Sequence, residues 1–246
     1  VCIASDALQS ENFPNVIFDI ALLDSLGAKV VVVFGGDHKV KAVLEANGSN
    51  WLQAGGRRIT NAIQIETVTS VLGQMYADLS ARFSASTPES PAKRRAITTS
   101  TGNFIRAKPL GIKNGVDHQL SGLVRNINEA AIRHQLSDGS IVLIPSIGYS
   151  PSGETFHLDV DVVAREVACA LTADKLIFMT EQAGLKDTIG NLISEIDLSD
   201  TRTGDVSLEP LPEKLLDHCD QACRKGVARC HIISFATDGA LLEELF

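Results

Sequence analysis

Two apolar runs and an amphipathic stretch between them form the clearest pattern along the chain. Ser140–Pro145 and Lys175–Met179 each have the length and apolar character of a buried strand. Between them, apolar residues recur with helical spacing over Val163–Leu171, and either Asp159 or Asp161 is suited to cap the first turn. A strand, a helix and a second strand in this order predict a βαβ unit, with parallel pairing and a right-handed crossover.

The same patterns predict further elements along the chain. The predicted strands are Val1–Ser5, Lys29–Phe34, Ala96–Thr99, Ile105–Lys108, Leu123–Ile127 and Ala228–Ile233. The predicted helices are Asn12 or Asn15 to Leu26, Asp37–Ala46, Thr60 or Asn61 to about Arg82, Glu129–Leu136 and Leu211–Lys225. Gly102-Asn103 suits a hairpin between the strands on either side, and Ser84–Arg95 has the composition of a mobile surface loop. Together these elements predict an α/β fold, an open and mostly parallel sheet with ligand loops beyond the carboxyl ends of its strands.

Composition limits the classes of partner. The 246 residues carry 22 basic and 30 acidic side chains, a formal charge of −8, which argues against nucleic acid or an anionic membrane as the main partner. The apolar runs are far shorter than the roughly 20 residues of a membrane-spanning helix. Five cysteines, an odd number, fit a reduced protein of the cytoplasm better than a disulfide scaffold. Val1 is not a natural start, so we expect a trimmed amino-terminal end.

Two glycine-rich turns are candidate anion sites. Gly35-Gly36 follows an apolar strand and precedes a helix, an arrangement in which backbone N–H groups converge. Arg57 and Arg58 lie in the second turn and suit a carboxylate clamp. The alternatives are an ordinary strand-to-helix corner and a turn with solvated arginines. Acidic residues at the start of the central helix suit acid chemistry or capping equally well.

A cluster of cysteines and histidines near the carboxyl-terminal end raises the question of a metal. Cys219 and Cys223 form a C-x3-C pair, with Cys230, His218 and His231 close by in sequence. A single such pair is a weak metal signal, and a structural role is favoured. No arrangement typical of nucleophilic catalysis is evident. We therefore predict neither a metal site nor catalytic residues in this chain.

The order of segments resembles the amino-acid kinase family almost end to end. The matching pieces are Val30–Gly36, Gly56–Thr60, Leu158–Thr180 and the closing ARCHII and DGALLEELF. Within the family, TGNFIRAKPLGIKNGVDHQLSGLVRNI and GYSPSGETFHL are similar to the amino-terminal domain of bacterial N-acetylglutamate synthases. The resemblance implies one domain over residues 1–246, with a three-layer fold around an open, mostly parallel sheet.

The resemblance also implies a regulatory site. In the arginine-sensitive members, the counterparts of His231 and Glu244 bind the inhibitor, beside a turn that contains the counterpart of Gly239. The synthases acetylate L-glutamate with acetyl-CoA in the first step of arginine biosynthesis. Their acetyltransferase domain follows the closing ELF and is absent from this chain. The expectation is therefore a homo-oligomeric domain with L-arginine as allosteric ligand and no cofactor, because acetyl-CoA would bind the missing domain.

Departures from the kinase pattern leave two alternatives. The family's Lys-x-Gly-Gly opening is replaced by Cys2–Ser5, which argues against phosphoryl transfer. Gly35, Gly36, Arg58 and Asp161 are then a vestigial kinase-type substrate site. The first alternative is a kinase that phosphorylates N-acetylglutamate with ATP. The second is a purely structural oligomerisation module, which predicts no ligand response.

Overall fold

The computed structural model describes residues 1–4, 6–85, 97–182, 184, 193 and 210–244. Most of the predicted loop at Ser84–Arg95 lies outside these residues. Ser84 itself is the last residue of a long helix.

The centre of the molecule is a six-stranded sheet in the order β14-β13-β1-β2-β10-β5. Its strands are β1 (Cys2–Ile3), β2 (Val31–Phe34), β5 (Thr98–Ser100), β10 (Ser140–Pro145), β13 (Lys175–Thr180) and β14 (Arg229–Ser234). All neighbouring strands are parallel, and the short β1 sits between Phe178 of β13 and Val33 of β2. The prediction of an open, mostly parallel α/β sheet is confirmed.

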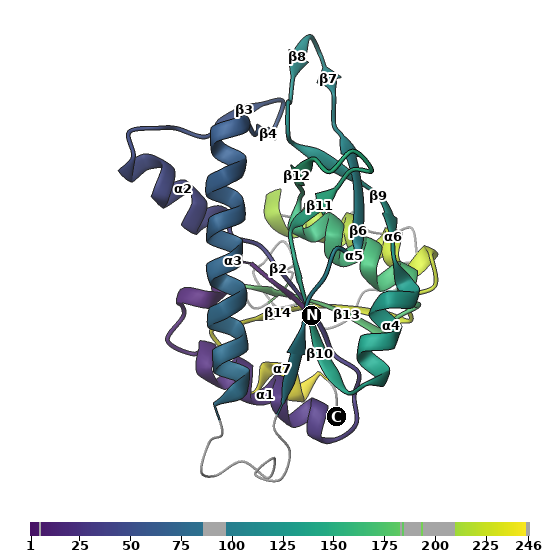
Figure 1. The fold of residues 1–246 in the computed structure, drawn as a ribbon. Coiled ribbons are helices and arrows are strands. Elements are labelled where there is room, and N and C mark those ends of the chain that lie inside the picture. Colours follow the sequence, from purple (N-terminus) through teal and green to yellow (C-terminus); the bar gives the residue numbers. More distant parts are fainter. Residues whose placement is uncertain (5, 86–96, 183, 185–192, 194–209, 245–246) are drawn as a thin grey trace.

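Helices cover both faces of this sheet and make three layers (Figure 1). One face carries α1 (Phe13–Ser25), α2 (Asp37–Ala46), α3 (Ala62–Ser84) and the short α7 (Ala240–Glu243). The other face carries α4 (Glu129–Ser137), α5 (Val160–Leu171) and α6 (Pro210–Arg224). Successive residues of a strand point to opposite faces, so Phe34 lies in the first apolar core and Val33 in the second.

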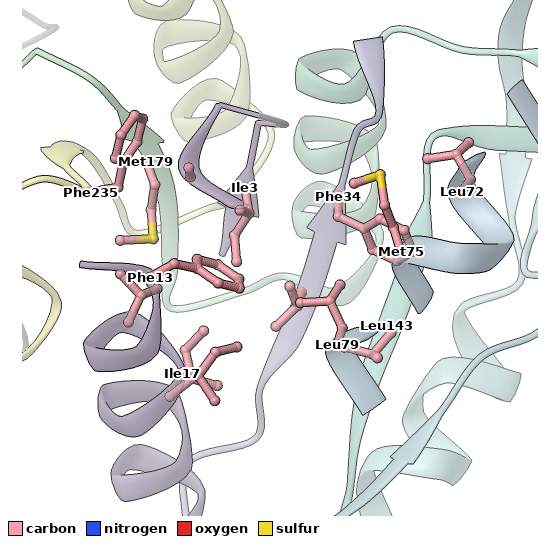
Figure 2. Packing of buried hydrophobic residues seen from close by; sticks show 14 of the residues in the cluster. Ile3, Phe13, Ile17, Phe34, Leu72, Met75, Leu79, Leu143, Met179 and Phe235 are labelled. Atoms are coloured by element: carbon pink, nitrogen blue, oxygen red, sulfur yellow. The ribbon is translucent and has the colours of Figure 1, made fainter. Parts of the chain in front are cut away.

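The first core shows how the layers are held together. Figure 2 shows Phe13 and Ile17 of α1 packed against Ile3, and Met75 and Leu79 of α3 beside the sheet. Leu79, Phe13 and Ile3 are fully buried. Burial of such side chains contributes roughly 1.5–3 kcal/mol each, which explains why the fully apolar strands lie at the centre.

Polar caps begin three of the helices where the sequence predicted them. Asn61 accepts from the backbone of Gln64, whose side chain accepts in turn from the backbone of Asn61, at 2.8 and 3.0 Å. The Asn128 side chain accepts from the backbone N–H of Ala131 and so caps α4. Asp159, the first of the two candidates at α5, accepts from the backbone of Asp161. These bonds satisfy backbone donors that the first helical turn leaves unpaired.

A second, four-stranded sheet has the order β12-β11-β6-β9. Its strands are β6 (Ile105–Pro109), β9 (Gly122–Ile127), β11 (Ile147–Tyr149) and β12 (Thr155–His157). Two small hairpins, β3 (Leu52–Ala54) with β4 (Arg57–Ile59) and β7 (Ile112–Lys113) with β8 (Val116–Asp117), lie at the same end of the molecule (Figure 1).

The hairpin predicted at Gly102-Asn103 is wrong. The strand before it, β5, pairs in parallel with β10 in the central sheet, whereas β6 pairs antiparallel with β9 in the second sheet. Phe104 is buried at this crossing, and Ile105 and Ala107 of β6 enter the second core. Burial of the apolar side of β6 therefore determines which sheet the strand joins, and the turn residues before it do not.

Candidate functional site

An open cleft of about 470 Å³ lies at the carboxyl ends of β1, β2 and β13. Gly35 after β2, Arg58 from β4 and Asp161 from the first turn of α5 all line it. Three of the four residues predicted for the vestigial site are thus together. Gly36 is the exception, because it does not line the cleft. A side chain at that position would meet Leu72 and Met75 of α3. Gly36 serves helix packing.

A polar network holds the cation of this cleft in place. The Arg58 guanidinium forms an ion pair with Asp37, at the start of α2, and lies over the Trp51 ring at 5.4 Å. Trp51 stacks on the imidazole of His157, with ring centres 5.2 Å apart. His157 Nε2 lies 3.4 Å from Asp37 Oδ1, and its Nδ1 lies 3.4 Å from the Thr60 hydroxyl. Arg58 is therefore held from several sides.

The charge state of this network follows from its burial. Burial, reinforced by the Arg58 guanidinium, lowers the pKa of His157 well below its usual value. His157 is thus neutral at pH 7, and its contacts assign the proton to Nε2, which donates to Asp37, while Nδ1 accepts from Thr60. Burial also lowers the pKa of Arg58, an effect that Asp159 and Asp161 oppose.

A second cation closes the other side of the cleft. Lys214 of α6 donates to Asp159 at 3.0 Å and to Asp161 at 2.9 Å. Burial alone would raise the pKa of Asp159, but the adjacent Lys214 ammonium holds it below its usual value. The same pairing raises the pKa of Lys214, although burial opposes this shift. Lys214 thus joins α6 to the start of α5.

The chemistry of the cleft is limited by these internal pairs. Lys41, Arg58 and Lys214 line it, and each pairs with a carboxylate of the chain itself. An incoming carboxylate or phosphate would compete with these carboxylates for the cations. Four residues of the cleft and its polar network were not predicted from the sequence, namely Asp37, Trp51, His157 and Lys214. Only Trp51 had a sequence feature that could have marked it, because it is the single tryptophan of the chain.

The residues predicted to bind arginine form a separate cluster at α7. His231 lies on β14, and its Nδ1 is 2.7 Å from Oε2 of Glu244, which directly follows α7. Gly239 adopts the left-handed conformation, with φ at 73°, and begins α7. The chain can therefore turn back and bring Glu244 to the strand. All three predicted residues belong to one local unit.

One further residue of this cluster was missed. Lys175, the first residue of β13, donates from Nζ to the backbone carbonyl of Glu244. Lys175 and Ile177 point to the same face of β13, and Ile177 is paired with His231. This register places an ammonium, an imidazole and a carboxylate on one face. No local signal marks Lys175, because its position depends on which strands pair.

The exposed group of this cluster is the Glu244 carboxylate. His231 Nε2 is buried and has no hydrogen-bond partner among the described residues. The Glu244 side chain is 44% exposed. An exposed carboxylate suits a small ligand that carries several hydrogen-bond donors.

Helix α1 adjoins this cluster and carries a buried acid. Asn12, just before α1, donates to the carbonyl of Phe235 at 3.0 Å, and α1 contacts α7. Asp19 of α1 is buried, with 5% of its surface exposed. Burial, with a smaller contribution from the Asp238 charge, raises the pKa of Asp19 to about 6.

Asp19→Asn is expected to stabilise the chain at pH 8 and to change little at pH 4. The folded-state pKa lies above the ordinary value of 3.8, so ionisation costs stability. This cost develops as the pH rises from about 4 to about 6 and is complete above that range. A neutral amide removes about 1–2 kcal/mol of it. Urea unfolding at both pH values checks the prediction, and an equal gain at both would contradict it.

Two further observations concern the part of the chain that the structure describes. There, no group of three or more His, Cys, Asp or Glu side chains is arranged to hold a metal ion. Nor does any helix of that part have the length and apolar character to cross a membrane.

The fold agrees with the family that the sequence matches. Residues 3–234 match the amino acid kinase family, and the chain belongs to that family. Its relatives are named amino-acid acetyltransferase: that of Shewanella oneidensis is 38% identical, and that of Escherichia coli 36%. Both alignments cover 100% of this chain and 57% of the relative. The chain thus spans little more than half the length of these curated relatives.

Solved structures agree with this placement. N-acetylglutamate synthase from Neisseria gonorrhoeae, complexed with coenzyme A and L-arginine, matches with a TM-score of 0.91 and 29% identity. The match covers 100% of this chain and 57% of that one. Carbamate kinase from Giardia lamblia, bound to AMP-PNP, has a TM-score of 0.66 at 16% identity, covering 94% and 86% of the two chains. At that identity, the likeness to the carbamate kinase concerns the fold alone.

Proposed function

We propose that this chain is the arginine-sensing regulatory and oligomerisation domain of an N-acetylglutamate synthase. The observation that carries the proposal is the pairing of His231 with the partly exposed carboxylate of Glu244, beside the Gly239 turn. The synthase from Neisseria gonorrhoeae, which was solved with L-arginine, supports it as a related structure.

The cluster offers complementary groups for each end of L-arginine. A carboxylate accepts two N–H donors of a guanidinium side by side, which assigns that end to Glu244. The ligand carboxylate requires a cation or backbone N–H groups, which Lys175 and the Gly239 turn supply nearby. His231 Nδ1 pairs with Oε2 of Glu244 and so fixes the position of this carboxylate. A lysine ligand lacks the planar fork and would lose one of the two bonds to Glu244.

In this proposal the chain does not perform the chemistry of the whole enzyme. The complete synthase would acetylate L-glutamate with acetyl-CoA, in the first step of arginine biosynthesis. Acetyl-CoA would bind outside this domain, which itself needs no cofactor. Arginine would then act by favouring one of two packed arrangements of the oligomer. Light scattering with and without L-arginine tests the oligomer, and a strictly monomeric chain would contradict that part.

The direct test is thermal unfolding with millimolar L-arginine, with D-arginine and L-lysine as controls. A ligand that binds only the folded state raises the midpoint by mass action. We expect a rise with L-arginine that neither control reproduces. Equal shifts with all three compounds would indicate nonspecific ion binding, and no shift at any concentration would favour a purely structural module.

No turnover of ATP is expected, with or without N-acetyl-L-glutamate. Phosphoryl transfer requires cations positioned around the phosphates, and the cations that line the cleft are paired with the chain's own carboxylates. A coupled ATPase assay at saturating N-acetyl-L-glutamate checks this. Turnover above the blank that disappears in Lys214→Ala would establish the kinase alternative instead.

A further inference from the structure

Two thiols meet at the junction between α6 and the edge strand of the central sheet. Cys223 lies in the last turn of α6, and Cys230 is the second residue of β14. Their sulfur atoms are 3.7 Å apart, and the Cys230 sulfur also lies 3.7 Å from the Cys219 carbonyl. Both cysteines are free and partly exposed. The sequence singled out these cysteines, but the proposed arginine site does not use them.

The short segment between the two cysteines holds them in register. The backbone N–H of Gly226 donates to the Cys223 carbonyl at 3.1 Å, and that of Val227 donates to Ala222 at 3.1 Å. Gly226 has φ at 103°, and the buried Ala222 and Val227 anchor the segment in the second core. A bond requires the sulfur atoms to move from 3.7 Å to about 2.05 Å. This approach requires rotation of the two side chains together with a shift of the β14 backbone at Cys230 toward α6.

We propose that Cys223 and Cys230 form a reversible disulfide, and that this bond weakens the arginine response of the site at His231. The second half of the proposal rests on the proposed function. Cys230 directly precedes His231, and successive strand residues point to opposite faces. Cys230 faces α6, whereas His231 pairs with Glu244 on the other side. Drawing Cys230 toward α6 therefore moves the backbone of His231 away from Glu244.

The oxidant is a low-molecular-weight disulfide such as oxidised glutathione. Cys223, which precedes the exposed Arg224–Gly226, loses its proton, and its sulfur attacks the glutathione disulfide. That S–S bond breaks and releases one glutathione thiolate. Cys230 then loses its proton and attacks the mixed disulfide, which releases the second glutathione. Two electrons pass from the protein thiols to the glutathione disulfide, and the two protons go to the released thiolates or to solvent.

The rate of this exchange depends on the local charges. Burial, then the neighbouring Cys230 and Asp220, raises the pKa of Cys223 to about 11. Cys219 and burial also raise the pKa of Cys230, and Cys169 lies in the same neighbourhood. The thiolate is the attacking species, so the reaction is slow at pH 7 and faster at pH 8.5, where the experiment is run.

The full chain is incubated at pH 8.5 with oxidised or reduced glutathione, and free thiols are counted after denaturation. The count is expected to fall from five to three, with a peptide map that links Cys223 to Cys230. Cys223→Ser keeps its four thiols, whereas Cys169→Ser, the matched control, falls from four to two. The bond closes a short loop and raises the thermal midpoint by about 5 °C. An unchanged count, or a bond to Cys169 or Cys219, overturns the proposal.

The coupling is tested by titrating L-arginine into both forms. We expect the dissociation constant to rise about fivefold or more in the oxidised form, and Cys223→Ser to bind equally well under both conditions. Equal affinity of the two forms overturns the coupling. If the reduced chain does not respond to arginine, the proposed function fails and the coupling with it, while the disulfide still stands or falls on the thiol count.

Discussion

Glu244→Ala is expected to lose most of the rise in thermal midpoint that L-arginine produces. At a concentration of about 100 times the dissociation constant, the ligand stabilises the folded state by about 2.7 kcal/mol. This corresponds to a rise of roughly 5–10 °C for a chain of this size. Loss of a charge-assisted hydrogen bond costs about 1.5–3 kcal/mol. The variant should therefore bind roughly tenfold to a hundredfold more weakly, and the rise at that concentration should fall at least by half.

Glu243→Ala is the matched control for this experiment. Glu243 is exposed, carries the same charge and is the last residue of α7, directly before Glu244, but His231 pairs with Glu244. The control should keep the full response. The unfolding midpoint without ligand separates binding from folding, because an intact midpoint shows that α7 still packs. A full response in Glu244→Ala would show that the Glu244 side chain does not bind arginine. Lys175 would then be the next residue of the cluster to substitute.

Gly122→Ala is expected to destabilise the chain by about 2–3 kcal/mol. A Cβ atom at Gly122 would lie 2.6 Å from Cβ of Phe156 and 3.1 Å from Cδ2 of Leu158. Phe156 Cβ is next to the backbone, so β9 or β12 must shift to make room. The neighbouring Ser121 donates to the Arg58 carbonyl at 2.8 Å, so this shift also reaches the cleft. Denaturant unfolding measures the change.

Gly73→Ala is the counterpart with the opposite sign. Gly73 lies in the interior of α3, and a Cβ atom there would meet nothing within 4 Å. Alanine loses less conformational entropy in a helix, so a gain of about 0.5–1 kcal/mol is expected. Comparable losses in both variants would show that steric space at Gly122 does not explain the first effect.

Strand β13 connects the two sites of the domain. Lys175 at its start contacts Glu244 in the arginine cluster, and Thr180 at its end lines the cleft. Between them, Phe178 and Ile177 enter different apolar cores. A displacement of β13 along its axis would therefore shift residues at both ends of the strand and in both apolar cores. One continuous strand therefore contributes a residue to the arginine cluster and a residue to the cleft.

Much of the fold followed from local pattern. The apolar runs of β2, β10, β13 and β14 and the helices between them were predicted, because periodicity depends on neighbouring residues. The cap at Asn128 was predicted too, and Asn61 and Asp159 were each one of two candidate caps. The expectation that His231 and Glu244 belong to one arginine site came from the resemblance alone. A single glutamate near the end of a chain has no pattern of its own that marks a ligand.

The rest was decided by contacts between residues far apart in sequence. The turn at Gly102-Asn103 looked like a hairpin, but the burial of Ile105 and Ala107 placed β6 in another sheet. Lys175 reached Glu244 only through the register of β13 with β14. Asp37 and His157 met Arg58 from different elements. Local sequence determines which face of an element is apolar, whereas the free energy of packing whole elements together determines which faces meet.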